Sequence, residues 1–220
     1  TFYDITTTWN DRPVIKFESD EQHFLEIADN DRMNNSSGPQ TQRTIITAFR
    51  TGSNISDRQV IFEEGGGTRG LNIYIEDDSL RMGGWNFDEN VWGYSGVKDE
   101  IKTNTPYFAI FLFDFDGKNG NDGIRGYLNG EYLGLLPDAD LLYPHAGDIG
   151  IGAMNNGACF EGADENNDPV YCGGDASYFE GFISELISGN LLYNDAQAKI
   201  LNNYLAIKYA TSLPNGDTLY

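Results

Sequence analysis

Hydrophobic and polar residues alternate along most of the chain with a period of two, as half-buried β-strands require. Residues 107–115 form the most apolar run, which indicates a central strand buried on both faces. Asn129 and Gly130 stand between two alternating segments, a strong signal for a β-hairpin. The pattern predicts strands at residues 13–18, 23–27, 44–50, 59–64, 71–75, 79–82, 107–115, 123–128, 131–134, 148–153 and 178–187.

One segment near the C-terminus has a different period. Apolar residues between Ile200 and Leu205 recur at the spacing of one helix face. Asn194 or Asp195 can cap the N-terminal end of such a helix. The sequence therefore predicts one amphipathic helix over residues 194–209.

The number of short strands determines the expected fold class. We predict an all-β protein, a two-sheet antiparallel jelly-roll sandwich with one C-terminal helix. Hydrophobic residues make up 40% of the 220 residues, enough to form a core, which excludes disorder as the main state. We expect a single domain over residues 1–213, followed by a short polar tail at residues 214–220.

The chain is strongly acidic. Its 34 Asp and Glu residues against 14 Lys and Arg residues produce a formal charge of −20. This charge argues against nucleic-acid binding, because nucleic-acid phosphates would be repelled. No apolar run approaches about 18 residues, so no membrane insertion is expected. Divalent cations remain as partners, and a plain solvated acidic surface is the alternative.

Cys159 and Cys172 are the two cysteines and lie in one polar loop. A zinc site would need about four nitrogen or sulfur ligands, and the nearest histidine is the distant His145. A disulfide that closes this loop is favoured and would indicate an exported, extracellular protein. Two reduced thiols in a cytosolic protein are the alternative. The chain begins at Thr1 without a signal-like segment, so we expect it to be part of a longer protein.

Several segments together carry a resemblance to a known family. They are residues 62–75, the hairpin at 126–134, residues 150–153 and the closing strand and helix over 179–209. This order resembles the laminin-G-like, concanavalin-A-like jelly-roll modules of large bacterial surface proteins, over about residues 9–212. The acidic loops are similar to those of calcium-dependent ligand-binding domains in bacterial adhesins. The resemblance implies a cell-surface module of an adhesin, with Ca²⁺ at a site that binds a glycan or a protein C-terminus on another cell.

The cysteine loop is the first candidate calcium site. Asp164, Asn166 and Asp168 stand at alternate positions, and Asn156 and Asp175 lie nearby. Alternating oxygen side chains on a curved loop can converge on one Ca²⁺ ion. The alternative is a solvated acidic loop.

The turn after the central strand is the second candidate. Asp114, Asp116, Asn119 and Asp122 surround several glycines and resemble the ligand spacing of calcium loops. The alternative is a long hairpin turn built from residues that favour turns.

A glycine cluster is the third candidate. Gly66 and Gly67 let a ligand approach the backbone closely, Glu64 could bind an ion, and Arg69 could pair with a carboxylate. A β-bulge near the sheet rim is the alternative.

Two tryptophans in a segment rich in Gly and Asn form the fourth candidate. Trp85 and Trp92 are predicted to form an aromatic platform for a sugar or peptide, with Asn86 and Asp88 as polar partners. The alternative is a loop held over the sandwich by its own aromatic side chains.

These candidates favour a binding function. Glycoside hydrolases of this fold need a pair of carboxylates across a cleft, and we find no strand with that spacing, so we expect no enzyme activity. The sequence predicts calcium-dependent ligand binding; a calcium-rigidified spacer domain is the alternative, and a glycoside hydrolase comes after it.

Overall fold

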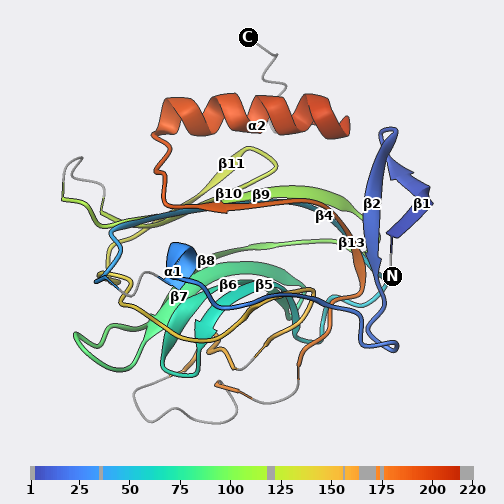
Figure 1. Ribbon diagram of the computed structural model, residues 1–220. Helices are drawn as coiled ribbons and strands as arrows, with labels where there is room; N and C mark the ends of the chain where they lie inside the picture. Colours follow the sequence, from blue (N-terminus) through green and yellow to red (C-terminus); the bar gives the residue numbers. More distant parts are fainter. Residues whose placement is uncertain are drawn as a thin grey trace.

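The computed structural model describes residues 3–34, 37–117, 122–155, 157–163, 172–173 and 176–213. In these ranges the chain forms two antiparallel sheets stacked face to face, with one long helix outside them (Figure 1). This confirms the predicted all-β sandwich with a C-terminal helix. Within the same ranges, no helix is long and apolar enough to cross a membrane. The predicted tail at 214–220 lies outside the described residues.

The first sheet has seven described strands. Their order across the sheet is β1 (Tyr3–Trp9), β2 (Arg12–Phe17), β13 (Gly181–Gly189), β4 (Gln42–Thr51), β9 (Pro106–Asp114), β10 (Gly123–Leu128) and β11 (Glu131–Leu136). The neighbours in its middle, β2, β13, β4 and β9, come from distant parts of the chain.

The second sheet has six described strands, four of them joined as consecutive hairpins. The order is β3 (Leu25–Ile27), β12 (Ile149–Ile151), β5 (Gln59–Gly66), β6 (Arg69–Glu76), β7 (Ser79–Asn86) and β8 (Gly93–Glu100). A single helical turn, α1 (Asp31–Asn34), precedes β4.

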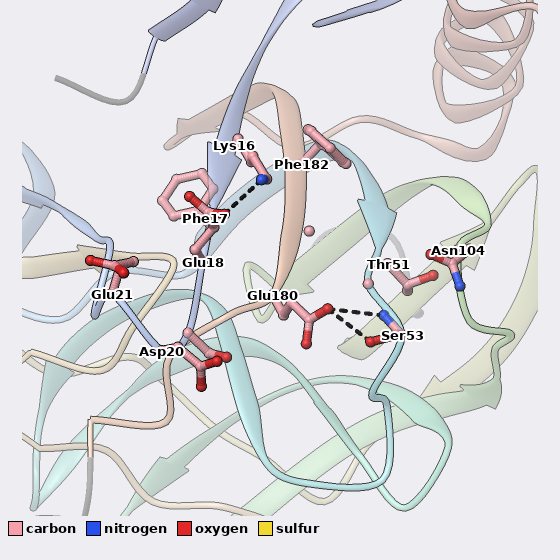
Figure 2. Close-up of a pocket in the computed structure, with 13 residues that line it drawn as sticks. Lys16, Phe17, Glu18, Asp20, Glu21, Thr51, Ser53, Asn104, Glu180 and Phe182 are labelled. Atoms are coloured by element: carbon pink, nitrogen blue, oxygen red, sulfur yellow. Dashed lines mark hydrogen bonds and ion pairs between the residues drawn. The ribbon is translucent and has the colours of Figure 1, made fainter.

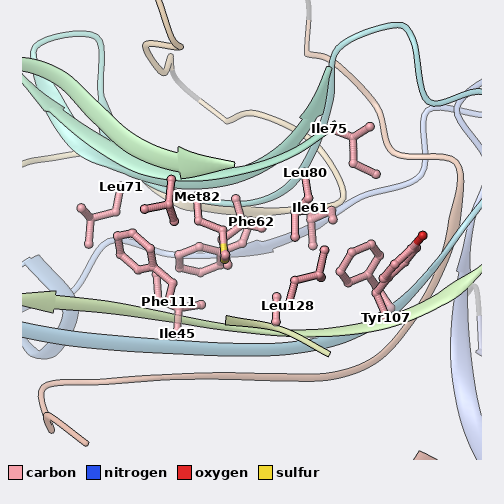
Figure 3. Close-up of a cluster of buried hydrophobic side chains, with 14 of the residues drawn as sticks. Ile45, Ile61, Phe62, Leu71, Ile75, Leu80, Met82, Tyr107, Phe111 and Leu128 are labelled. Carbon is pink, nitrogen blue, oxygen red and sulfur yellow. The ribbon is translucent and has the colours of Figure 1, made fainter. Parts of the chain in front are cut away.

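The main hydrophobic core fills the space between the two sheets. Ile45 and Phe111 of the first sheet face Phe62, Leu71 and Met82 of the second (Figure 3). All five side chains are 2% exposed or less. Burial of each such side chain contributes about 1.5–3 kcal/mol, so this layer holds the sheets together.

The helix α2 (Asp195–Tyr209) covers the outer face of the seven-stranded sheet (Figure 1). It begins with a capping box, in which the Gln197 N–H donates to Asn194 Oδ1 at 2.9 Å and the Asn194 N–H donates to Gln197 Oε1 at 3.0 Å. Helix and sheet share a second apolar cluster of buried residues: Ile46, Ala48, Phe108, Ile110, Leu112, Tyr127, Ala198, Leu205, Ala206 and Tyr209.

The described parts of the cysteine loop, residues 157–163 and 172–173, lie on the outer face of the six-stranded sheet. Cys159 and Cys172 form a disulfide, as the sequence predicted. Their loop shares a third cluster of buried residues with β5, β6 and β7: Val60, Tyr74, Trp85, Met154, Ala158, Cys159, Phe160 and Cys172.

Strand β7 is longer than the pattern predicted. The sequence predicted that this strand ends at Met82 and is followed by a loop rich in Gly and Asn, whereas the strand continues to Asn86. A side chain at Gly83 would lie 2.4 Å from the Tyr94 hydroxyl, and one at Gly84 would lie 2.5 Å from Leu71. Glycine is required here because neighbouring groups approach the strand closely, not because the chain turns.

Candidate functional site at the rim of the sandwich

The turn between β5 and β6 borders a pocket of about 270 Å³ at one end of the sandwich. We call it the rim pocket. Four of its lining residues were predicted as ligand-binding from two separate motifs: Gly66, Gly67, Arg69 and Asp88. The other four are Thr68, Pro144, His145 and Ala146.

Backbone contacts from three directions hold this turn in place. The Trp85 indole N–H donates to the Gly66 carbonyl oxygen at 2.9 Å, and the Phe87 N–H donates to the Thr68 carbonyl oxygen at 2.9 Å. Cys159 Sγ lies 3.2 Å from the Gly67 carbonyl oxygen, so the disulfide also braces the turn. The pocket wall is therefore built on rigid parts of the fold.

Arg69 is the cationic group of the rim pocket. Its guanidinium lies 2.7 Å from Asp88 Oδ2 and 5.7 Å from the centre of the Tyr143 ring. The Arg69 side chain is 17% exposed, whereas Asp88 is 62% exposed. An exposed carboxylate partner is readily exchanged for another one, so Arg69 can pair with a carboxylate of a ligand.

His145 adds a neutral polar group. Both ring nitrogens are buried and have no hydrogen-bond partner in the described part of the chain. Burial, and then the charges of Arg43 and Arg69, lower its pKa to about 4. The ring is therefore neutral at pH 7, with one nitrogen able to donate and the other to accept a hydrogen bond.

A buried ion pair lies at the same end of the sandwich. Arg43 Nε is 2.9 Å from Glu64 Oε1, and both side chains are completely buried. The Arg43 charge opposes the rise in pKa that burial imposes on Glu64. Glu64 was predicted as a calcium ligand, and that role stays a prediction. Its Oε1 pairs with Arg43, so an ion would have to share this carboxylate with a buried arginine.

The acidic turn after β9 brings three of its predicted ligands together. Carboxylate oxygens of Asp114, Asp116 and Asp122 all lie within 4.8 Å of one another. Burial raises the pKa of Asp114, and the charges of Asp116 and Asp122 raise it further. Arg125 partly compensates, with a guanidinium nitrogen 3.1 Å from Asp114 Oδ2. We call these three aspartates the acidic triad.

The acidic triad and the rim pocket share one end of the molecule. Gln42, the first residue of β4, pairs with Asp114 across the sheet and donates to Asp116 Oδ2 at 2.8 Å. The next residue, Arg43, reaches Glu64 of the other sheet, two residues before Gly66. Two stretches that are 50 residues apart in the sequence thus meet at the same rim.

The aromatic platform is not formed as predicted. Trp85 is completely buried under the cysteine loop, where its indole supports the β5–β6 turn. Trp92 is partly buried against the inter-sheet core. The buried Asn86 side chain donates to the Glu89 carbonyl oxygen at 2.8 Å and so closes its own loop. None of these three side chains lines the rim pocket, and Trp85 supports it from behind.

The remaining predicted metal ligands lie outside the described residues. They are Asn119, Asn156, Asp164, Asn166, Asp168 and Asp175. Their role stays a prediction.

A larger pocket, of about 470 Å³, lies at the opposite end of the sandwich, where β13 meets the end of β4 (Figure 2). Glu180 is fixed there by hydrogen bonds from the N–H and hydroxyl of Ser53, at 3.2 and 3.0 Å. The charged lining comprises one base and four acids: Lys16, Glu18, Asp20, Glu21 and Glu180. This acidic lining would repel the carboxylate that Arg69 attracts.

Comparisons with known proteins support the fold. No protein-family model matches the chain, and no curated protein matches it in sequence. The Ruminococcus gnavus IT-sialidase CBM40 bound to α2,3-sialyllactose is similar in structure, with a TM-score of 0.52, 14% identity and coverage of 82% of this chain and 96% of that one. The binding domain of botulinum neurotoxin DC, solved with rat synaptotagmin II, has a TM-score of 0.59 at 12% identity. That match covers 92% of this chain and 45% of the toxin chain, so the present chain spans less than half of it.

Proposed function

We propose that this chain is a ligand-binding module that holds a glycan or a peptide terminus in the rim pocket. The observation that carries the proposal is that one pocket contains both Arg69 and His145, whose ring nitrogens have no hydrogen-bond partner among the described residues. A guanidinium binds a carboxylate, and a neutral imidazole can hydrogen-bond to a hydroxyl or an amide. The structural neighbours give further support, since one was solved with α2,3-sialyllactose and another with rat synaptotagmin II.

The ligand that suits this pocket carries a carboxylate. A terminal sialic acid and a peptide C-terminus both do. The formal charge of −20 would repel such a ligand over most of the surface, and a local cation is needed to reverse this. Arg69 supplies one charge, and we propose that Ca²⁺ supplies more.

The acidic triad is the calcium site of this proposal. Asp114, Asp116 and Asp122 supply the oxygen ligands that Ca²⁺ prefers, and their mutual repulsion would be relieved by the ion. They fit the ion with one adjustment, because Asp114 would share its carboxylate with Arg125. A Ca²⁺ ion at this rim would make the approach of an anionic ligand favourable.

The setting of the module is also a proposal. The disulfide supports an exported protein, since disulfides persist in oxidising compartments. We propose an extracellular, laminin-G-like module of a bacterial surface adhesin, without catalytic activity. A single site of this size binds weakly, and display of many copies on a cell would raise its avidity.

Calorimetric titrations with 3′-sialyllactose and with short peptides test the site, each in Ca²⁺ and in EDTA. Arg69→Gln should weaken binding by at least about tenfold, because it removes a charged hydrogen bond to the ligand. Arg50→Gln, an exposed arginine at the opposite end, is the matched control and should bind as the wild type does.

Three outcomes would contradict parts of the proposal. Binding that is unchanged in Arg69→Gln would remove the rim pocket as the site. Binding that is equal in EDTA would remove calcium from it. No binding of any sugar or peptide would leave a spacer domain, and release of free sugar from 3′-sialyllactose would indicate an enzyme.

A further inference from the structure

The outer face of the six-stranded sheet carries two glutamates in register across three strands. Gly150 of β12 pairs with Glu26 of β3 on one side and with Glu63 of β5 on the other. Residues directly opposite one another in a sheet project to the same face. The two carboxylates therefore flank a glycine, which leaves the space between them open for the loop that follows β12.

That loop folds back over Gly150 and contacts both glutamates. A side chain on Gly150 would lie 2.2 Å from the Ala153 carbonyl oxygen, so glycine is required at this position. The Asn155 N–H donates to Glu63 Oε1 at 2.8 Å, and Asn155 Nδ2 donates to Glu26 Oε2 at 2.9 Å. Asn155 thus bridges the two carboxylates.

Glu63 is left incompletely satisfied in this arrangement. Its side chain is 0% exposed, and its Oε2 atom is buried without a hydrogen-bond partner in the described residues. No ion pair to Glu63 occurs within those ranges either, and the neighbouring charge of Glu64 is repulsive. A buried carboxylate oxygen with no partner is strongly unfavourable, so such a group calls for a bound ion, a proton or a water molecule.

We propose that Glu63 and Glu26 bind a calcium ion on the outer face of the six-stranded sheet, with the N–H groups of Asn155 holding both carboxylates in position. The ligands are a buried carboxylate and an exposed carboxylate, hard oxygen donors of the kind that Ca²⁺ takes. The Ala153 carbonyl lies over the same glycine and supplies a further oxygen. Water would complete the six to eight oxygen ligands that Ca²⁺ typically takes.

A cation explains this cluster better than water alone. Neither carboxylate is paired with an arginine or lysine in the described ranges. Without an ion, the buried Glu63 must keep a proton, and Ca²⁺ would displace that proton. Ca²⁺ would neutralise both carboxylates and fasten the loop to the sheet at one point. The site is independent of the rim pocket and of the acidic triad, because it uses other residues on another face.

Calcium titration by calorimetry, with the number of bound ions as the readout, tests this site. Glu63→Gln should bind one Ca²⁺ ion fewer than the wild type. Glu21→Gln, an exposed glutamate elsewhere, should bind the same number as the wild type. Asp116→Asn alters the acidic triad and should leave the ion at Glu63 in place.

A second variant keeps the test decisive if Glu63→Gln fails to fold. Glu26 is exposed, so Glu26→Gln should fold and should weaken this ion by at least about tenfold. An unchanged number of ions and unchanged affinities in both variants would overturn the proposal. Ligand binding at the rim pocket should persist in either variant, so failure here and failure of the proposed function are distinguishable.

Discussion

The two outer faces of the sandwich are covered by very different segments. A capped helix, α2, lies on the seven-stranded sheet and meets apolar side chains such as Ile46 and Phe108. An irregular, disulfide-closed loop lies on the six-stranded sheet, where buried polar residues such as Glu63 and Asn72 stand among the apolar ones. Both covers bury the sheet beneath them, but they treat its buried charges differently. The buried Arg125 pairs with Asp195 of α2 at 3.0 Å, whereas Glu63 under the loop has no ion pair in the described residues.

The difference follows from how each segment satisfies its backbone. A helix pairs its own N–H and C=O groups, so it can rest on a wholly apolar surface. An irregular loop must find partners for these groups, and the sheet provides them. Asn72 Nδ2 donates to the Cys159 carbonyl oxygen at 2.8 Å, and the Tyr74 hydroxyl accepts from the Glu161 N–H at 2.8 Å. Polar side chains of the sheet are therefore buried under the loop as partners of its backbone.

The largest effect is expected on the helix-covered face. Leu205→Ala removes a 1%-exposed side chain from the contact between α2 and the sheet and should lower the free energy of unfolding by about 2–5 kcal/mol. Ile200 lies on the same helix at 66% exposure, and Ile200→Ala should leave stability nearly unchanged. Urea denaturation measures both. Equal losses would show that α2 is not docked as described.

On the loop-covered face the disulfide takes the place of helix packing. The double variant Cys159→Ala with Cys172→Ala should lower the free energy of unfolding by about 3 kcal/mol, because the unfolded chain gains conformational freedom. Ligand binding at the rim pocket should weaken too, since Cys159 braces Gly67. A variant as stable as the wild type in urea would show that the loop is held by its packing alone.

Stability should depend on pH through the loop-covered face. Burial, opposed by the Asn155 and Gly150 N–H groups and aided by the charge of Glu64, raises the pKa of Glu63 to about 9 from 4.5. The folded state keeps this proton to a higher pH than the unfolded chain does. The stability that this proton contributes to the folded state is complete below about pH 4.5 and is lost as pH rises towards 9.

In EDTA this loss should amount to about 1 kcal/mol per pH unit between pH 6 and 8. Glu63→Gln should flatten the pH profile of the free energy of unfolding, and Glu21→Gln should not. A wild-type profile identical to that of Glu63→Gln would show that Glu63 does not titrate in this range.

The smallest effect concerns the helix end. Asn194→Ala removes the side-chain acceptor of the capping box and should cost about 1 kcal/mol. Asn203→Ala, in the middle of the same helix, is the control and should cost less than the cap variant. A larger loss for Asn203 in urea denaturation would contradict this ranking.

Local patterns predicted those parts of the site that depend on short-range chemistry. Asp114, Asp116 and Asp122 lie in one turn, so their meeting follows from turn residues alone. Arg69 and Asp88 were each singled out, but their pairing across the rim required the β6–β7 register. The sequence did not predict that His145 lines a pocket, because no neighbouring residue in the chain forms a recognisable motif with it.

Trp85 and Glu63 show where the local pattern misleads. Gly83 and Gly84 favoured a loop in the sequence pattern, which placed Trp85 in that loop instead of on a buried strand face. In β5 an irregularity between Val60 and Phe62 shifts the register with β6. Beyond it Glu63 faces the outer loop and Glu64 faces Arg43, an assignment that simple alternation cannot make.

The sequence by itself determined the sandwich, its closing helix and the disulfide, since each depends on periodicity, capping or residue type. Only the tertiary structure decided which polar groups are buried together. The rim pocket joins loops that follow β5, β7 and β11, and the Glu63 cluster joins β3, β5 and the loop after β12. Contacts between such distant segments depend on strand order and register across the sheets. The periodicity of hydrophobic residues along the chain does not specify either one.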